Sequence, residues 1–245
     1  MNKNIVVHKK ISILTSIVLF GLGSFSANAA VIDLFELAVN IDGVVSSIGG
    51  SGSSGDPVPG TVDLTGFDGT TGLGQIDITI TGAGLHNALV FMDHEIDEAI
   101  NTFFNESAST DGTPAGGQSW EADEPGFLFG DIFDNVLVNT LDNTNGVPAG
   151  SEDDVSMALG WDFSLAAGET ALASFFTRTT NNIGSFFIEQ FDPDSVASIF
   201  FWSTLDITGD TEPPEPPIAM PEPGTLGLAL FGILSVFGLQ RRRVR

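Results

Sequence analysis

The chain has 245 residues, 42% of them hydrophobic and none of them cysteine, so it can form one or two domains with a substantial core but no disulfide, thiolate metal site or cysteine nucleophile. Seven of its eight Lys and Arg residues lie in the first ten or the last five positions, which leaves Arg178 among all 32 acidic residues. The stretch from Asp33 to Glu222 therefore carries a formal charge of −31 and repels phosphate backbones, which excludes nucleic acid as a partner.

Residues 1–29 have the three-part layout of a secretory signal peptide. A basic stretch up to Lys10 precedes an apolar run over 11–25. The small residues that a signal peptidase requires follow at once, at Ala27, Ala29 and Ala30. The sequence therefore predicts export and cleavage between the last two of these alanines, with an uncleaved membrane anchor as the alternative.

The mature chain is expected to begin at Ala30, because the small side chains at the two preceding key positions fit signal peptidase. N-terminal sequencing of protein recovered from the envelope or medium of the host checks this. An intact Met1 on most molecules would contradict it.

Alternating apolar and polar residues over 30–208 predict one extracytoplasmic all-β domain. The clearest strand runs from Val155 to Leu165, and a turn at 166–169 predicts that Leu172–Thr180 pairs with it as a hairpin. Further strands are predicted at Val31–Ile41, Ile76–Ile80, Leu85–Met92, Phe127–Phe133, Asn135–Leu141, Ser185–Phe191 and Ser198–Ile207. About nine short strands separated by Gly-, Asn- and Asp-rich turns indicate an antiparallel β-sandwich.

Three segments depart from this pattern. Glu95–Phe104 is the one helical candidate, and a strand is the alternative there. The Gly- and Ser-rich segment Ser46–Gly60 predicts a flexible surface loop. Residues 209–219 are rich in proline and predict an extended stalk between the body and the membrane.

The C-terminal segment 220–245 predicts a membrane helix. Its apolar run from Gly224 to Leu239 would span ~24 Å as a helix, close to the ~30 Å of a hydrocarbon core. Arginines follow at Arg241, Arg242 and Arg243, where positive charge favours the cytoplasmic side. This orientation leaves the acidic body outside, and a buried C-terminal helix of the domain is the alternative.

The order of these features resembles the PEP-CTERM sorting signal: the triplet Pro221, Glu222 and Pro223, a short apolar helix, and terminal arginines. The resemblance implies export in a Gram-negative bacterium and recognition by an exosortase, a membrane-embedded protease-transpeptidase that processes near the triplet. It also implies association with exopolysaccharide and biofilm matrix. The strand around Trp161 and the turn at Asp192–Ser195 resemble the β-rich bodies of PEP-CTERM proteins without an assigned function.

The body offers little for acid–base or nucleophilic catalysis. It has two histidines, His86 and His94, no lysine or tyrosine, and no G-x-S-x-G elbow. A glycosidase needs two facing carboxylates, but among so many acids a pair is expected by chance. We therefore predict a protein that is not an enzyme.

The run from Asp93 to Glu98 is the densest set of potential metal ligands, although it lacks the second histidine of an H-E-x-x-H motif. Calcium suits the acidic loops better, because it takes hard oxygen ligands and is supplied outside cells. The named candidates are Asp93, Asp192 and Asp194, within loops at 93–98, 121–124, 131–134, 142–154 and 192–195. A solvated acidic surface without metal is the competing interpretation, and no other cofactor is expected.

Carbohydrate binding would use exposed aromatic rings, and Trp120 is the candidate because it lies in a polar segment. A loop anchor that plugs one end of the sandwich is the alternative role for Trp120. Trp161 and Trp202 fall on predicted strands and are expected to pack in the core.

Together these features predict an exported, exosortase-processed protein without enzymatic activity, first anchored in the inner membrane and then placed at the envelope surface or in the exopolysaccharide matrix. The alternative is a carbohydrate- or calcium-binding adhesion module on the same scaffold. A hydrolase acting on matrix polysaccharide is the third possibility.

Overall fold

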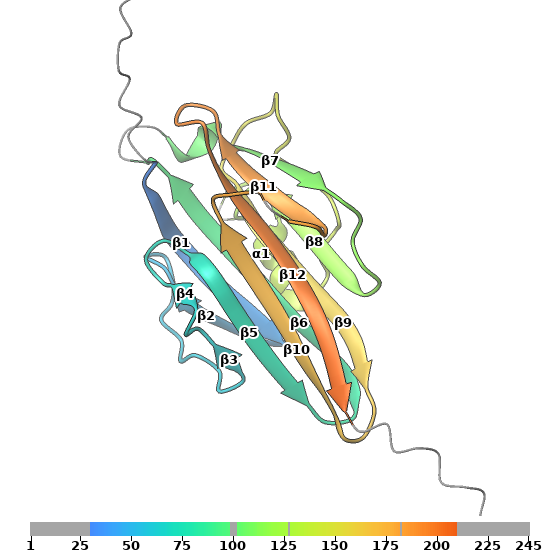
Figure 1. The fold of residues 1–245 in the computed structure, drawn as a ribbon. Coiled ribbons are helices and arrows are strands. Elements are labelled where there is room, and N and C mark those ends of the chain that lie inside the picture. The colour runs from blue at the N-terminus through green and yellow to red at the C-terminus, as the bar shows by residue number, and fades with distance from the viewer. Residues whose placement is uncertain (1–29, 99–101, 127, 182, 210–245) are drawn as a thin grey trace, which may run out of the picture.

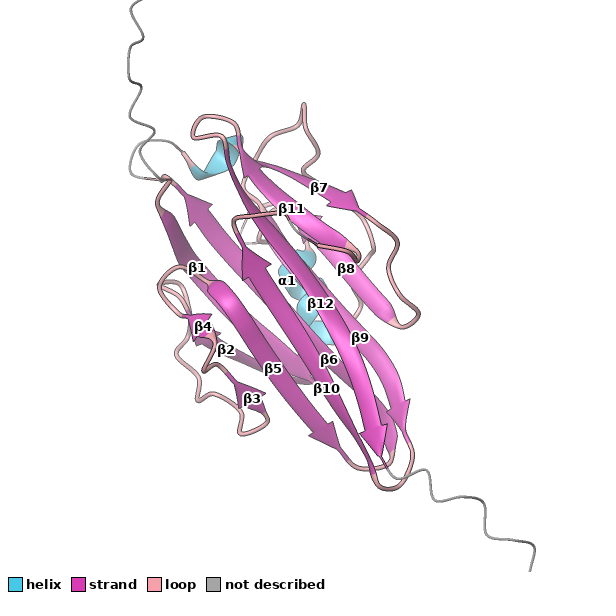
Figure 2. Ribbon diagram, viewed as in Figure 1, coloured by secondary structure: helices cyan, strands magenta, loops and turns pink. Residues whose placement is uncertain are grey.

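The computed structural model describes residues 30–98, 102–126, 128–181 and 183–209. They form two antiparallel sheets (Figures 1 and 2). The first sheet has the order β2 (Val44–Gly49), β1 (Ile32–Ile41), β6 (Gly84–Ile96), β9 (Ser156–Leu165) and β8 (Gln118–Asp123). The second has the order β3 (Val62–Asp63), β5 (Leu73–Thr81), β10 (Glu169–Arg178), β12 (Ala197–Gly209), β11 (Phe187–Asp192) and β7 (Ser107–Asp111), with β4 (Phe67–Asp68) also paired to β5.

The two sheets pack face to face, because alternate residues of each strand are apolar and bury against the other sheet. The first sheet contributes Leu37, Val39, Val90, Met92, Met157 and Leu159 to this core. The second contributes Ile76, Ile78, Phe175, Ile188 and Phe201. The all-β expectation is confirmed in this form: a mostly-β, sandwich-like body of two antiparallel sheets.

The predicted hairpin between the Val155–Leu165 and Leu172–Thr180 segments is wrong. Both are strands, but β9 pairs with β6 and β8 in the first sheet, whereas β10 pairs with β5 and β12 in the second. The turn at 166–169 therefore carries the chain from one sheet to the other. Apolar residues on both strands face the shared core from opposite sides, and this pattern looks the same in sequence as that of a paired hairpin.

The predicted strands Phe127–Phe133 and Asn135–Leu141 are also wrong, because their central part is the helix α1 (Ile132–Val138). Ile132 and Val136 are spaced by four residues, so they share one helix face, and both are fully buried. That face covers the outer side of the first sheet at Ala38, Leu89, Phe91 and Ala158. The helix ends at Asn139 in the left-handed conformation (φ 54°), whose N–H is donated to carbonyls of the last turn.

The segment Glu95–Phe104 is not the predicted helix over its described residues. Strand β6 continues to Ile96, and a single 3₁₀ turn, η1, covers Phe103–Asn105. The segment Ser46–Gly60 is not loop throughout, because β2 extends to Gly49.

The predicted signal peptide 1–29 and cleavage site, the stalk beyond Gly209, and the sorting signal at 220–245 lie outside the described residues. Among the residues that the structure describes, no helix has the length and apolar character needed to cross a membrane.

Candidate cation-binding pocket

A pocket of about 710 Å³ opens where β1 begins and β6 ends, at the upper end of the first sheet in Figure 1. Two kinds of side chain dominate its walls. The acidic ones are Asp93, Glu95, Glu98, Glu124, Asp153 and Asp154. The aromatic ones are Phe35, Phe103, Phe104 and Phe129.

Strand alternation places the central carboxylates. Leu89 and Phe91 of β6 point outward under α1, so Asp93 and Glu95 lie on the same outer face, just past the helix. Asp93 is paired with Ser156 at the start of β9, and Asp154 lies two residues before that serine. One carboxylate oxygen each from Asp93, Glu95 and Asp154 lies within 4.8 Å of the other two. The three groups thus converge on one point.

These carboxylates are buried and incompletely hydrogen-bonded. Asp93 is 1% exposed and Glu95 is 9% exposed. Asp93 Oδ1, Glu95 Oε2 and Asp154 Oδ1 are inaccessible and have no hydrogen-bond partner. Buried polar oxygens without a partner carry a desolvation cost of about 1–3 kcal/mol each, and more when charged. A group of this kind indicates a missing partner.

Burial and mutual repulsion raise the pKa values of all three groups. Burial raises the pKa of Asp93 well above its usual value, and the charges of Asp154 and Glu95 add to this. Burial first, and then the charge of Asp154, raises the pKa of Glu95 to about 7. Burial and the charges of Asp153 and Glu124 raise the pKa of Asp154 to about 7. Negative charge is therefore concentrated here without compensation.

Two further buried acids adjoin the pocket from β1 and β7. Glu36, paired with Asp93 across β1 and β6, accepts a hydrogen bond from Ser47 Oγ at 2.5 Å. Glu106, at the bridge preceding β7, is 1% exposed and accepts hydrogen bonds from the Ile96 N–H and from Gln190 Nε2. Burial raises the pKa of Glu106 to about 9.

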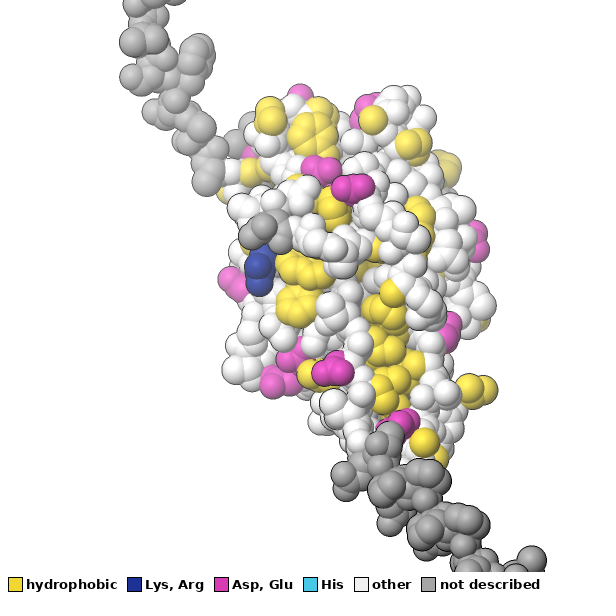
Figure 3. All heavy atoms as spheres, turned by 45° about the vertical axis from the view of Figure 1, so that its right-hand side comes forward, with side chains coloured by type: hydrophobic (Ala, Val, Ile, Leu, Met, Phe, Trp, Pro, Cys, Tyr) yellow, Lys and Arg dark blue, Asp and Glu magenta, His cyan; other side chains and the backbone are white. Residues whose placement is uncertain are grey.

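No basic side chain of the described chain balances this charge. Arg178 is the one Lys or Arg among the described residues, and its guanidinium lies 5.2 Å from the ring centre of Trp202 in the second sheet. In Figure 3 the basic atoms lie beside an apolar patch. His94 lies on β6 between the two carboxylates, so strand alternation points it to the opposite, inner face. Its Nε2 lies 3.1 Å from the Gly72 carbonyl oxygen. Burial lowers its pKa to about 4, so His94 is neutral.

The predicted ligands are separated by the fold. Asp93 belongs to the pocket, but Asp192 and Asp194 lie at the turn between β11 and β12. Asp192 accepts hydrogen bonds from Asn105 Nδ2, from the Asp194 and Ser195 N–H groups, and from Ser195 Oγ. These bonds give the Asp192 carboxylate a structural role in the turn, and calcium at this turn stays an untested prediction.

A second acidic group brings together Glu121, Asp131 and Asp142 from three of the predicted loops. Its buried member, Glu121, is already hydrogen-bonded: Asn135 Nδ2 donates to both of its oxygens and the Asp142 N–H donates to one. The carboxylate of Glu121 thus ties β8 to α1 and to the chain after it. This group lacks the partnerless buried oxygens of the first one.

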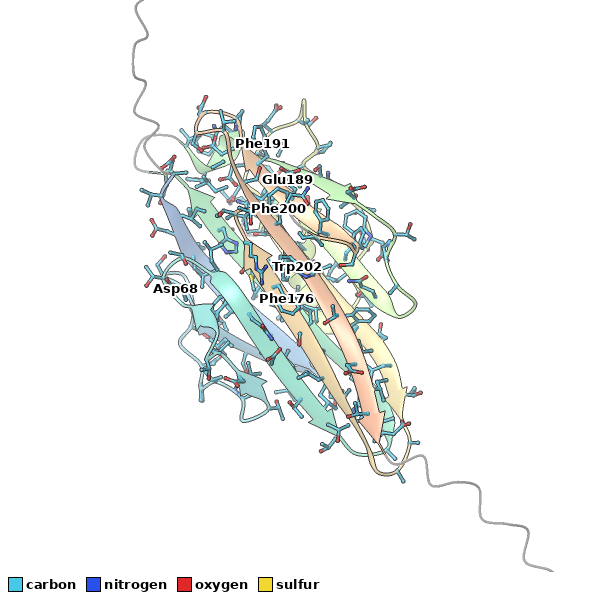
Figure 4. All side chains as sticks on the ribbon, viewed as in Figure 1. Asp68, Phe176, Glu189, Phe191, Phe200 and Trp202 are labelled. Atoms are coloured by element: carbon cyan, nitrogen blue, oxygen red, sulfur yellow. The ribbon has the colours of Figure 1, made fainter. Side chains whose placement is uncertain are left out.

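The predicted loop position of Trp120 is wrong, because the residue lies in β8. Its ring packs 5.5 Å from that of Phe186 and against the main core, which favours packing over a ligand platform. Trp202, expected in the core, instead faces outward on the second sheet, where it stacks on Phe176 with 5.1 Å between ring centres (Figure 4).

Sequence reasoning missed the pairing of Asp154 with Asp93 and Glu95, and the exposed phenylalanines around them. Alternation of Asp93 and Glu95 with buried neighbours, as a continuation of the Leu85–Met92 strand, was the available signal. Comparisons of the chain with models of protein families, with curated proteins and with solved structures found no match. The pocket therefore has to be interpreted from its own chemistry.

Proposed function

We propose that this chain is an exported β-sandwich module that binds one calcium ion in the pocket formed by Asp93, Glu95 and Asp154, and that it has no enzymatic activity. The observation that carries the proposal is the set of three converging carboxylates whose buried oxygens have no partner. A cation supplies the missing partner for all three at once and removes their mutual repulsion.

The geometry suits calcium. Calcium binds oxygen at about 2.3–2.6 Å, so one ion can bridge oxygens up to about 4.8 Å apart, the limit within which these three lie. The ligands are oxygens alone, because His94 points to the inner face, and this disfavours transition metals. Magnesium prefers a tight octahedral shell with several waters, which a rigid set of buried carboxylates fits less well.

The electrostatics disfavour a polysaccharide hydrolase. A glycosidase divides its two carboxyl groups into a protonated acid and an ionised partner by pushing their pKa values apart. Here the pKa values of Glu95 and Asp154 are both raised to about 7. Three carboxyl groups raised together behave as one cation site rather than as an acid and a nucleophile.

Calcium titration of the full-length chain, purified in mild detergent and followed by calorimetry at fixed ionic strength, tests the proposal. We expect one saturable site with Kd of about 10⁻⁴ to 10⁻³ M, the range of extracellular modules. Asp93→Asn should weaken binding by at least tenfold, roughly the loss of one charged ligand. The variant should fold, because it removes a buried charge.

Glu121→Gln is the matched control, since Glu121 is equally buried but belongs to the other acidic group. It should bind calcium as the wild type does. No saturable heat, or equal losses in both variants, would contradict the assignment of the pocket.

The wider setting of the module rests on the sequence. We infer that the signal peptide exports it, that the segment from Gly224 to Leu239 anchors the precursor in the inner membrane, and that an exosortase processes the tail near Glu222. The mature protein would then occupy the envelope surface or the exopolysaccharide matrix, where calcium is available.

Replacing Glu222 by Ala should leave membrane insertion intact, because the residue lies outside the apolar run, but should block processing. The measurement is the ratio of full-length to shortened protein in membrane and released fractions of the host. Joint replacement of Arg241, Arg242 and Arg243 by neutral residues is the companion variant, and it should disturb orientation and retention. Processing of Glu222→Ala at the wild-type rate would rule out the exosortase interpretation.

A further inference from the structure

We propose that the calcium ion of this pocket holds a neutral sugar residue by two adjacent hydroxyl groups, while the phenylalanines at the pocket mouth pack against the apolar face of the sugar ring. This inference rests on the proposed calcium site and adds the ligand that the site would bind.

The first argument is coordination number. Calcium takes six to eight oxygen ligands, and the three carboxylates of Asp93, Glu95 and Asp154 supply between three and six. A single ion also occupies a small part of a pocket of about 710 Å³, a volume typical of small-molecule sites. Coordination positions and space thus remain on the open side of the ion, where paired hydroxyls can enter.

The second argument is the distribution of exposed aromatic rings. Three phenylalanines in the described part of the chain are strongly exposed, and all three line this pocket: Phe103 at 39%, Phe104 at 53% and Phe129 at 68%. Phe103 and Phe104 lie edge to face, with 4.7 Å between ring centres. Exposed Leu128 joins them at the rim. Apolar rings gathered around buried carboxylates give one site both parts of sugar recognition: oxygen coordination and an apolar face.

The third argument is charge. The described residues contain one arginine against 28 acidic residues, so long-range repulsion disfavours an acidic polysaccharide. A neutral sugar avoids that repulsion and brings hydroxyl oxygens, which are adequate calcium ligands. This selects a neutral glycan with adjacent hydroxyls rather than a uronic acid polymer.

Binding of the full-length chain, in detergent, to an immobilised panel of neutral and uronic acid glycans tests this. With calcium present we expect retention on neutral glycans with adjacent hydroxyls, and loss of that retention on chelation. The double variant Phe104→Ala/Phe129→Ala should lose roughly tenfold or more in glycan affinity and keep calcium binding in the calorimeter. Leu85→Ala is the control, since Leu85 is 89% exposed at the other end of β6.

Each other outcome overturns the inference. Retention on uronic acid glycans alone would assign the ligand to a carboxylate, and retention that survives chelation would remove calcium from recognition. Normal calcium binding with no glycan retained would leave the proposed function standing and refute the sugar ligand. No calcium binding at all would refute the proposed function itself.

Discussion

Without divalent cations, the folded chain is expected to lose stability as the pH rises from about 5 to about 8. The pKa values of Glu95 and Asp154 are raised to about 7, and that of Glu106 to about 9. Over this interval the folded state holds protons that the unfolded state, with ordinary carboxyl pKa values near 4, has already released. Stability falls wherever the folded state binds more protons.

The loss should be on the order of 3 kcal/mol, because each raised pKa unit corresponds to about 1.4 kcal/mol and neighbouring carboxylates share their protons. The repulsion of a strongly acidic surface acts in the same direction. Urea denaturation at a series of pH values and constant ionic strength measures this effect. A cation-free chain that becomes more stable between pH 5 and 8 would contradict the raised pKa values.

Calcium should reverse this dependence, because it binds the ionised carboxylates of Asp93, Glu95 and Asp154 and competes with their protons. Millimolar calcium should stabilise the chain strongly at pH 8 and hardly at all at pH 5. In Asp93→Asn the calcium-induced shift in Tm at pH 8 should nearly disappear, whereas in Glu121→Gln it should be retained. Equal calcium shifts at both pH values would point to surface screening instead of a site.

Phe201→Ala is expected to lower the free energy of unfolding by about 3–5 kcal/mol. The Phe201 side chain is fully buried between the two sheets, with its ring centre 6.3 Å from that of Phe175. Truncation leaves a cavity where β12 faces the first sheet, and a loss of this size is a large share of the 5–15 kcal/mol typical of a domain. Urea denaturation measures it, and Phe201→Leu gives a smaller loss should the alanine variant not fold.

Phe176→Ala is the matched control. Phe176 stacks on Trp202 on the outer face of the second sheet and is only partly buried (Figure 4). Its truncation should cost at most half as much as that of Phe201. Equal losses for the two variants would mean that the inward and outward faces of β10 and β12 are assigned incorrectly.

Much of the fold could be predicted from strand periodicity. The Val155–Leu165 and Ile76–Ile80 segments are strands because apolar residues at every second position form one dry face. What periodicity does not encode is the partner of each strand. The hairpin expected across 166–169 was wrong for that reason, since β9 and β10 contribute to one core from different sheets.

Short apolar segments with helical and strand features were the second source of error. Ile132 and Val136 lie four residues apart and stabilise α1 by burial on the first sheet, but the same stretch also alternates partly at period two. Tertiary packing decided between the two patterns. No local signal in 127–141 reports that an apolar patch on Leu89 and Phe91 needs a cover.

The pocket could be predicted only in part. Asp93 was a candidate ligand because it lies in the densest acidic run, but the run was read as one cluster. Strand alternation divides it, placing His94 on the inner face and Asp93 and Glu95 on the outer face. Asp154 joins them through pairing of β6 with β9, a contact across about 60 residues of chain that sequence spacing does not reveal.

Diffraction from crystals of the exported chain grown with calcium, with anomalous signal used to locate the ion, tests the central claim most directly. The account predicts one strong anomalous peak about 2.3–2.6 Å from carboxylate oxygens of Asp93, Glu95 and Asp154. A peak among Glu121, Asp131 and Asp142 instead, or no peak in the pocket at millimolar calcium, would contradict it.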